Sequence, residues 1–195
     1  MALNRLHRWL AMILLAAPAM IYLSILLAQQ QSIATWEMVH KQTGYIALVL
    51  TILVFILNPV LASFPKFPIA AKVNRYRREI GVAAFGYVCI HFLAVVKFKL
   101  FERLYFDWID FSFQLAGFIA FLIFLLLALT SNNYSVRKLG GKRWKQLHRM
   151  GYIAEGCIFI HLFLQGGSVA LIALVAFTPL FVLQYVRRKK RLLRR

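Results

Sequence analysis

Long apolar segments dominate this chain and restrict it to one kind of fold. Six of them have the length of a membrane-spanning helix: residues 10–28, 44–64, 78–96, 111–130, 148–165 and 169–186. Because the bilayer core holds no water for backbone polar groups, such segments must form helices that satisfy their own hydrogen bonds. The sequence therefore predicts an all-α membrane protein. It should be a six-transmembrane helix bundle that forms a single domain over residues 1–195, without an internal repeat.

The composition agrees with a membrane location and argues against a nucleic-acid partner. Hydrophobic residues make up 62% of the chain and charged residues 15%, against roughly 25% charged residues in soluble domains. The formal net charge is +18, but the basic residues lie between and beside the apolar segments, where such residues set topology and meet anionic lipid. We therefore expect membrane lipid, and no nucleic acid, as the partner of these charges.

The basic residues also predict how the chain crosses the membrane. Of the 24 lysines and arginines, 20 fall before the first segment, in the second-to-third and fourth-to-fifth linkers, and in the tail. Cytoplasmic loops carry an excess of Lys and Arg, so both termini are expected in the cytoplasm, with 187–195 as a basic cytoplasmic tail. The first segment is longer than the core of a signal peptide, and we expect a retained anchor helix.

Two histidines inside apolar segments form the centre of the predicted site. His91 and His161 each lie well past the cytoplasmic end of a segment, so they are expected at similar depth in the outer half of the membrane. Imidazole deep in a membrane is costly and indicates a functional site, and it is a common axial ligand of haem iron. We therefore expect a haem between the third and fifth segments, with His91 and His161 on opposite faces of the iron. The alternative is two unrelated polar residues packed between helices.

A third histidine, His148, lies near the cytoplasmic end of the fifth segment, at the depth of Arg77 and Arg78. It is either a ligand of a second haem iron, a polar residue at a cofactor edge, or a surface residue. Arginine has no lone pair to offer a metal, but its guanidinium can bind a haem propionate or a flavin phosphate. The sequence thus leaves open whether there is one haem or two.

The basic segment 136–145 precedes His148 and contains two adjacent glycines in a predicted turn. Its candidates for holding a haem propionate or a flavin phosphate, besides the two arginines above, are Arg137, Lys142, Arg143 and Trp144. The alternative is that these charges only fix topology and bind anionic lipid. No glycine-rich nucleotide-binding pattern is present, so the chain is expected to lack a nucleotide-binding domain of its own.

Together these residues resemble the ferric-reductase-like transmembrane family, over roughly Thr43 to Arg188. The matching positions are Thr43, Gly44, Ala47, Leu48, Arg77, Arg78, Gly81, His91, Leu129, Thr130, Ser131, Arg137, Leu139, Gly140, Trp144, Leu147, His148, Tyr152 and His161. The resemblance implies a multi-pass protein of the bacterial inner membrane that binds haem b, with FMN as a further cofactor. Within the family, the chain is similar to the haem-binding membrane subunits of periplasmic protein-methionine-sulfoxide reductase systems.

That similarity also implies partners and a function. Electrons would come from a cytoplasmic flavin reductase or the quinone pool. They would pass to a periplasmic, molybdenum-containing methionine sulfoxide reductase subunit that repairs oxidised methionine. The chain would then be the electron-transfer subunit of an oxidoreductase system rather than its catalytic subunit. Two alternatives stay open: a ferric reductase or cytochrome-b-type quinol oxidoreductase with another acceptor, and a cofactor-free small basic transporter or scaffold.

Overall fold

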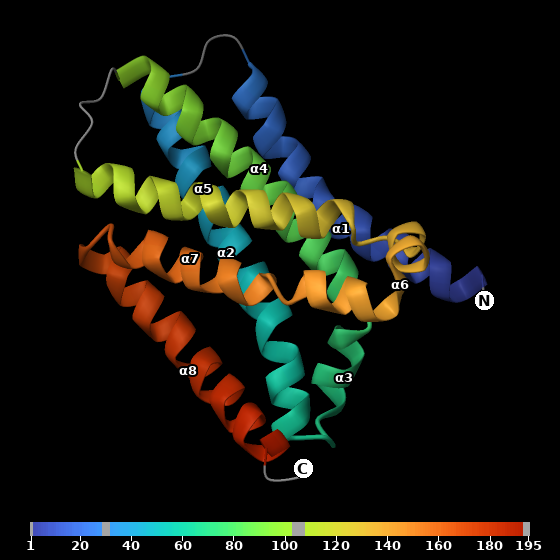
Figure 1. Ribbon diagram of the computed structural model, residues 1–195. Coiled ribbons are helices and arrows are strands. Elements are labelled where there is room, and N and C mark those ends of the chain that lie inside the picture. Colours follow the sequence, from blue (N-terminus) through green and yellow to red (C-terminus); the bar gives the residue numbers. More distant parts are fainter. Residues whose placement is uncertain (1, 29–31, 103–107, 193–195) are drawn as a thin grey trace. The chain divides into compact units, whose positions relative to one another are not determined.

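The computed structural model describes residues 2–28, 32–102 and 108–192, and these ranges are almost entirely helical (Figure 1). They contain no strand, so the all-α prediction is confirmed for the described part of the chain. Its helices are α1 (Ala2–Leu27), α2 (Ile33–Ser63), α3 (Pro68–Asn74), α4 (Arg77–Glu102), α5 (Trp108–Leu129), α6 (Asn133–His148), α7 (Gly151–Phe163) and α8 (Gly167–Leu192).

Five helical segments in the described ranges are long and apolar enough to cross a membrane. They are Leu6–Leu27, Ile33–Ser63, Arg77–Lys97, Phe111–Leu129 and Gly167–Lys189, which agrees with a multi-pass membrane protein. The predicted fifth span corresponds to α7, which has only 13 residues. Such a helix rises about 20 Å, against about 30 Å for the hydrocarbon core. A membrane span at α7, which would bring the number of spans to six, therefore stays a prediction.

The second apolar helix begins earlier than the sequence predicts. α2 starts at Ile33 rather than at residue 44, and its first turn is capped by Ser32, whose hydroxyl accepts from the Thr35 N–H at 3.2 Å. Glu37 and Lys41 lie outside the predicted span 44–64 but inside α2. They are four residues apart and form an ion pair at 2.5 Å, an arrangement that a helix surface accommodates.

The basic segment 136–145 is helical rather than a simple turn. It lies in α6, which is interrupted at Gly140, where φ is 74° and ψ is 149°. The fifth segment also differs from the prediction, because His148 ends α6 and α7 begins at Gly151 after a short turn. His148 and His161 therefore lie on different helices, so the regular geometry of a single helix does not determine how their two rings are oriented.

The chain divides into two compact units. Unit 1 comprises Met1–Leu104 and Leu180–Arg195, which include α1 to α4 and the end of α8. Within it, α2 and α4 lie side by side and run in opposite directions (Figure 1). A cluster of buried side chains joins α1, α2 and α4: Leu26, Trp36, Val39, Ile90 and Ala94. This packing places α2 against α4 near His91.

Contacts near both ends of α4 fix the direction of α1. Arg8 Nε lies 3.6 Å from Glu79 Oε1 near the start of α4, and Lys97 Nζ donates to the Leu26 carbonyl near the end of α1 at 2.5 Å. α1 is therefore parallel to α4. The N-terminal lead and the linker between α2 and α4 lie at the same end of unit 1, which agrees with the charge pattern of the sequence.

Unit 2 comprises Tyr105–Pro179. α5 and α7 lie side by side in opposite directions (Figure 1), and their core contains Ala120, Ile123 and Ala154. Trp144 ties α6 to the end of α5, because its Nε1 donates to the Thr130 carbonyl at 2.9 Å. α7 therefore packs against α5 in unit 2 as α4 packs against α2 in unit 1.

Candidate functional site

His91 lies on α4 in unit 1, and its ring packs against the N-terminal part of α2. Its Nδ1 lies 3.0 Å from the backbone oxygen of His40, and the two imidazole rings are stacked with centroids 4.6 Å apart. Because a carbonyl oxygen can only accept, the neutral ring carries its proton on Nδ1, and its metal-binding lone pair is on Nε2. A backbone carbonyl behind the ring is the usual partner of a metal-ligating histidine.

His161 lies on α7 in unit 2 and has the same arrangement. Its Nδ1 lies 2.8 Å from the backbone oxygen of Phe113 on α5, so Nδ1 is again the donor. Its Nε2 lies 3.3 Å from the side-chain nitrogen of Gln165. That nitrogen also donates to the His161 carbonyl at 3.0 Å, which fixes the orientation of the amide. Nε2 must therefore be the acceptor, and it holds the lone pair.

Each of these two histidines meets its neighbouring helix near that helix's beginning. His40 lies two turns into α2, which starts at Ile33, and Phe113 lies in the second turn of α5, which starts at Trp108. In the predicted topology both helices begin at the periplasmic side, and similar outer depths of the two histidines stay a prediction. His91 and His161 belong to different units, and their joint binding of one iron stays a prediction.

His148 differs from the other two histidines in the role of its nitrogens. Its Nε2 lies 3.2 Å from the Thr130 hydroxyl, just beyond the end of α5. That hydroxyl gives its single proton to the Leu126 carbonyl at 2.8 Å, so it accepts from His148, and Nε2 carries the proton. The Trp144 ring stacks on the imidazole with centroids 3.9 Å apart. Iron binding through Nε2 would require this contact with Thr130 to open.

The predicted cationic residues fall into two sets. Arg77 and Arg78 are half-buried in the first turn of α4, in unit 1. Arg137, Lys142 and Arg143 are exposed on α6, in unit 2, with half-buried Trp144 after them. The structure thus places two of the six at the start of α4 and four along α6, and it does not gather them within one unit. Their common role as an anion-binding site stays a prediction.

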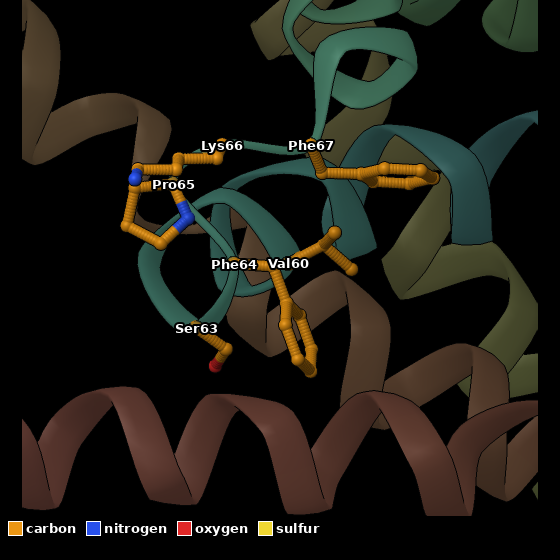
Figure 2. Close-up of a pocket in the computed structure, with 6 residues that line it drawn as sticks. All are labelled: Val60, Ser63, Phe64, Pro65, Lys66 and Phe67. Atoms are coloured by element: carbon orange, nitrogen blue, oxygen red, sulfur yellow. The ribbon is translucent and has the colours of Figure 1, made fainter.

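A hollow at the end of α2 is lined by none of the histidines or cationic residues named above. Figure 2 shows it at the turn between α2 and α3, lined by Val60, Ser63, Phe64, Pro65, Lys66 and Phe67. The lining is mostly apolar and contains no histidine. It therefore adds no ligand to the predicted site.

Sequence reasoning identified the histidines but missed the groups that orient them. The acceptors for His91 and His161 are backbone carbonyls of residues 40 and 113, and a carbonyl has no signature in the sequence. Thr130 appears in the sequence analysis only as a position of family resemblance, because its contact with His148 needs α6 to fold back onto the end of α5. One signal was present: a glycine lies four residues after each acceptor carbonyl.

A family model described as "Ferric reductase like transmembrane component" matches residues 43–158. The chain belongs to this family. The match contains α4 and α5, which carry His91 and Phe113, and it ends within α7, three residues before His161. The family match therefore covers α4 and the part of α2 from residue 43 in unit 1, and α5 and the part of α7 up to residue 158 in unit 2.

Curated relatives of two names are similar to parts of this ferric-reductase-like chain. Magnetosome protein MamZ of Magnetospirillum gryphiswaldense is 40% identical over 96 residues, which are 48% of this chain and 15% of the relative. The "protein-methionine-sulfoxide reductase heme-binding subunit MsrQ" of Herminiimonas arsenicoxydans is 39% identical over 90 residues, 45% of this chain and 41% of the relative. The MsrQ of Azospira oryzae is 42% identical over 81 residues, 40% of this chain and 35% of the relative.

The extent of these alignments limits what they mean. Each covers less than half of this chain and less than half of the relative, and the relatives have two different names. No solved structure gives a significant match. The chain therefore spans less than half the length of each of these relatives.

Each of the two imidazoles, taken within its own unit, has the donor chemistry that haem iron accepts from a protein. Both His91 and His161 have Nδ1 engaged by a backbone carbonyl, so the lone pair of each neutral ring is on Nε2. Iron binding at His161 would require the Gln165 amide to move away from Nε2. No cluster of three or more His, Cys, Asp or Glu side chains suited to a bare metal ion occurs in the part of the chain that the structure describes. Two imidazoles alone suffice for haem, because the porphyrin supplies the other four ligands.

Proposed function

We propose that this chain is a membrane electron-transfer subunit that binds haem b through His91 and His161. The observation that carries the proposal is the shared geometry of the two imidazoles, each held by a backbone carbonyl at Nδ1 with its lone pair on Nε2. Membership of the ferric-reductase-like family and similarity to MsrQ heme-binding subunits support it. Iron with two axial histidines has no open position, which suits electron transfer.

The chain's own residues would orient and shield such a haem. The carbonyls of residues 40 and 113 hold the two imidazole protons and keep each ring in one tautomer. The apolar helices around them keep water away from the iron, which limits side reactions with solvent. The haem supplies the one-electron chemistry when bound, and the protein sets its orientation and its potential.

We further propose a direction for the electrons, from the cytoplasm to the periplasm of a bacterial inner membrane. The cytoplasmic end would carry the basic residues of α6 and the start of α4. Arg77, Arg78, Arg137, Lys142 and Arg143 would bind an FMN phosphate or a haem propionate there. The donor would be a flavin reductase or a quinol. His148, beside Trp144, would lie at this entry side, either as a ligand of a second haem or as a polar residue at the cofactor's edge.

The proposed acceptor is a periplasmic, molybdenum-containing methionine sulfoxide reductase subunit, because of the similarity to MsrQ. A ferric reductase or a quinol oxidoreductase shares the transmembrane part and differs in its partners. An experiment must therefore separate the cofactor from the acceptor.

The test uses the full chain purified in detergent. Its absorption spectrum should show a haem Soret band, and NADH with a flavin reductase and FMN should reduce the haem. The reduced protein should then be reoxidised by the catalytic subunit in the presence of methionine sulfoxide, and not by ferric citrate at a comparable rate. Faster oxidation by ferric citrate would favour the ferric reductase. Absence of a Soret band after expression with haem supply would favour the cofactor-free transporter or scaffold.

A further inference from the structure

The two units contain the same contact between a histidine and a neighbouring helix. In unit 1, the carbonyl that accepts from His91 is followed four residues later by Gly44 on α2. In unit 2, the carbonyl that accepts from His161 is followed four residues later by Gly117 on α5. In an α-helix the N–H of the fourth residue along reaches the same carbonyl. Both imidazoles therefore lie directly against the backbone of a glycine.

The sequences around the two contacts align without a gap. Residues 81–91, GVAAFGYVCIH, and 151–161, GYIAEGCIFIH, are identical at five of eleven positions. Residues 44–47, GYIA, match 117–120, GFIA, at three of four. Equivalent positions are also buried alike, with Ala47 5% and Ala120 4% exposed. The expectation of no internal repeat is therefore wrong: α2 with α4 and α5 with α7 repeat one arrangement of helices.

The approach of each ring to its glycine leaves no room for a side chain. A Cβ atom at Gly44 would lie 2.9 Å from His91 Nδ1 and 3.0 Å from its Cε1. One at Gly117 would lie 2.7 Å from His161 Nδ1 and 3.0 Å from its Cε1. Ordinary contacts of a Cβ begin near 3.4 Å. The ring would therefore have to move by about 0.5 Å in unit 1 and about 0.7 Å in unit 2, away from the carbonyl that holds it.

Other glycines of the same two helix pairs do not show this contact. A Cβ at Gly86 on α4 or at Gly156 on α7 would meet nothing within 4 Å. The close approach is thus a property of the two positions that face a histidine, not of glycine in these helices. At Gly44 and at Gly117 the atoms nearest to the added Cβ belong to the Nδ1–Cε1 edge of the imidazole ring. None of the nearest atoms belongs to the backbone of a neighbouring helix.

We propose that Gly44 and Gly117 are equivalent positioning residues, which let each imidazole reach its carbonyl and so direct Nε2 of His91 and of His161 toward the iron. The proposal rests on the haem-binding function proposed above. The reason is steric and electronic together. Without a Cβ, the ring can approach until Nδ1 donates at 3.0 Å or 2.8 Å. That hydrogen bond fixes the tautomer and increases the basicity of the coordinating nitrogen.

The test compares Gly44→Ala and Gly117→Ala with two matched controls, Tyr45→Leu and Phe118→Leu. The control positions follow the glycines directly, at the same depth, and each is 44% exposed. The alanine variants should bind haem about 10- to 100-fold more weakly, the loss typical for an outer-shell partner. The midpoint potential of the haem they retain should move to more positive values, because a less basic imidazole stabilises ferric iron less. The controls should keep the wild-type affinity and potential.

A second measurement is independent of bound haem. Nitrogen-15 NMR of histidine-labelled protein prepared without haem should show His91 and His161 protonated at Nδ1, and a mixture of tautomers at the affected ring in each alanine variant. If the alanine variants do not fold, the wild-type tautomers decide, and an Nε2-protonated ring at either position would overturn the proposal. Wild-type haem affinity, potential and tautomers in both alanine variants would overturn it as well. If the wild type binds no haem at all, the proposed function fails, while the tautomers still test the packing.

Discussion

Replacing His161 by glycine should create a cavity that free imidazole can fill, and the structure predicts which imidazoles it accepts. In the native protein, Nδ1 donates to the Phe113 carbonyl at 2.8 Å and the opposite nitrogen is the proposed iron ligand. Imidazole can make both interactions, since it has one N–H and one lone pair. 1-Methylimidazole coordinates iron equally well in principle, but it carries a methyl group where the N–H should point. It should therefore restore the haem site of His161→Gly poorly.

The size of the difference follows from the contact. One hydrogen bond contributes a net 0.5–1.5 kcal/mol or so, which corresponds to about a 2- to 13-fold difference in affinity. The methyl carbon would also have to lie within the 2.8 Å that separates nitrogen from oxygen, so the ring must tilt. We therefore expect imidazole to bind at least about 10-fold more tightly than 1-methylimidazole, the upper part of that range.

The assay is a titration of haem-reconstituted His161→Gly with each ligand, followed by the low-spin absorption bands. The ratio of affinities for haem in detergent without protein provides the intrinsic reference. His91→Gly should show the same preference, because the carbonyl of residue 40 lies 3.0 Å from the corresponding nitrogen. Equal restoration by both ligands, after correction for the reference ratio, would refute the reasoning about Nδ1.

Three further predictions concern the residues proposed at the cytoplasmic side and the topology of the chain. Thr130→Val removes the hydroxyl that accepts from the His148 imidazole, so the free energy of unfolding, followed in a thermal melt, should fall by about 1 kcal/mol. The spectrum of the outer haem should not change. Arg77→Gln and Lys142→Gln should slow reduction by FMN and a flavin reductase while the haem content stays constant, because a phosphate needs cationic donors; unchanged rates would leave these residues a topological role only. A reporter fused after Arg195 should be active in the cytoplasm and a tag inserted in 103–107 should be labelled from the periplasm, and the reverse pattern would invert the proposed electron direction.

The helical membrane fold could be predicted because apolar length leaves few alternatives. Helix boundaries were predicted less accurately, as at the start of α2. Glu37 and Lys41 lie inside α2, where their i,i+4 spacing lets them pair on the helix surface at 2.5 Å. The short α3 was not predicted, although Pro68 at its first position is a favourable start. The break between α6 and α7 was not predicted, because the expected fifth segment began at His148 and so joined the end of α6 to α7 across the turn at residues 149–150.

The candidate site could be predicted only as far as side chains reveal it. Imidazole in an apolar segment identifies His91 and His161 without a structure. The carbonyls that hold them, and the glycines beside those carbonyls, become visible only when α2 is packed on α4 and α5 on α7. The repeat of these pairs was missed for the same reason. Five identities in eleven residues, about seventy positions apart, carry little weight until both segments are seen to make the same contact.

The most direct test of the central claim is the haem-to-protein ratio of the wild type, His91→Ala and His161→Ala, measured together with their electron paramagnetic resonance spectra. We predict a low-spin signal of bis-histidine haem in the wild type. Each variant should lose that signal, together with most of its haem or with conversion of the remainder to a high-spin form. Full haem occupancy with an unchanged low-spin signal in either variant would contradict the assignment of that histidine as a ligand.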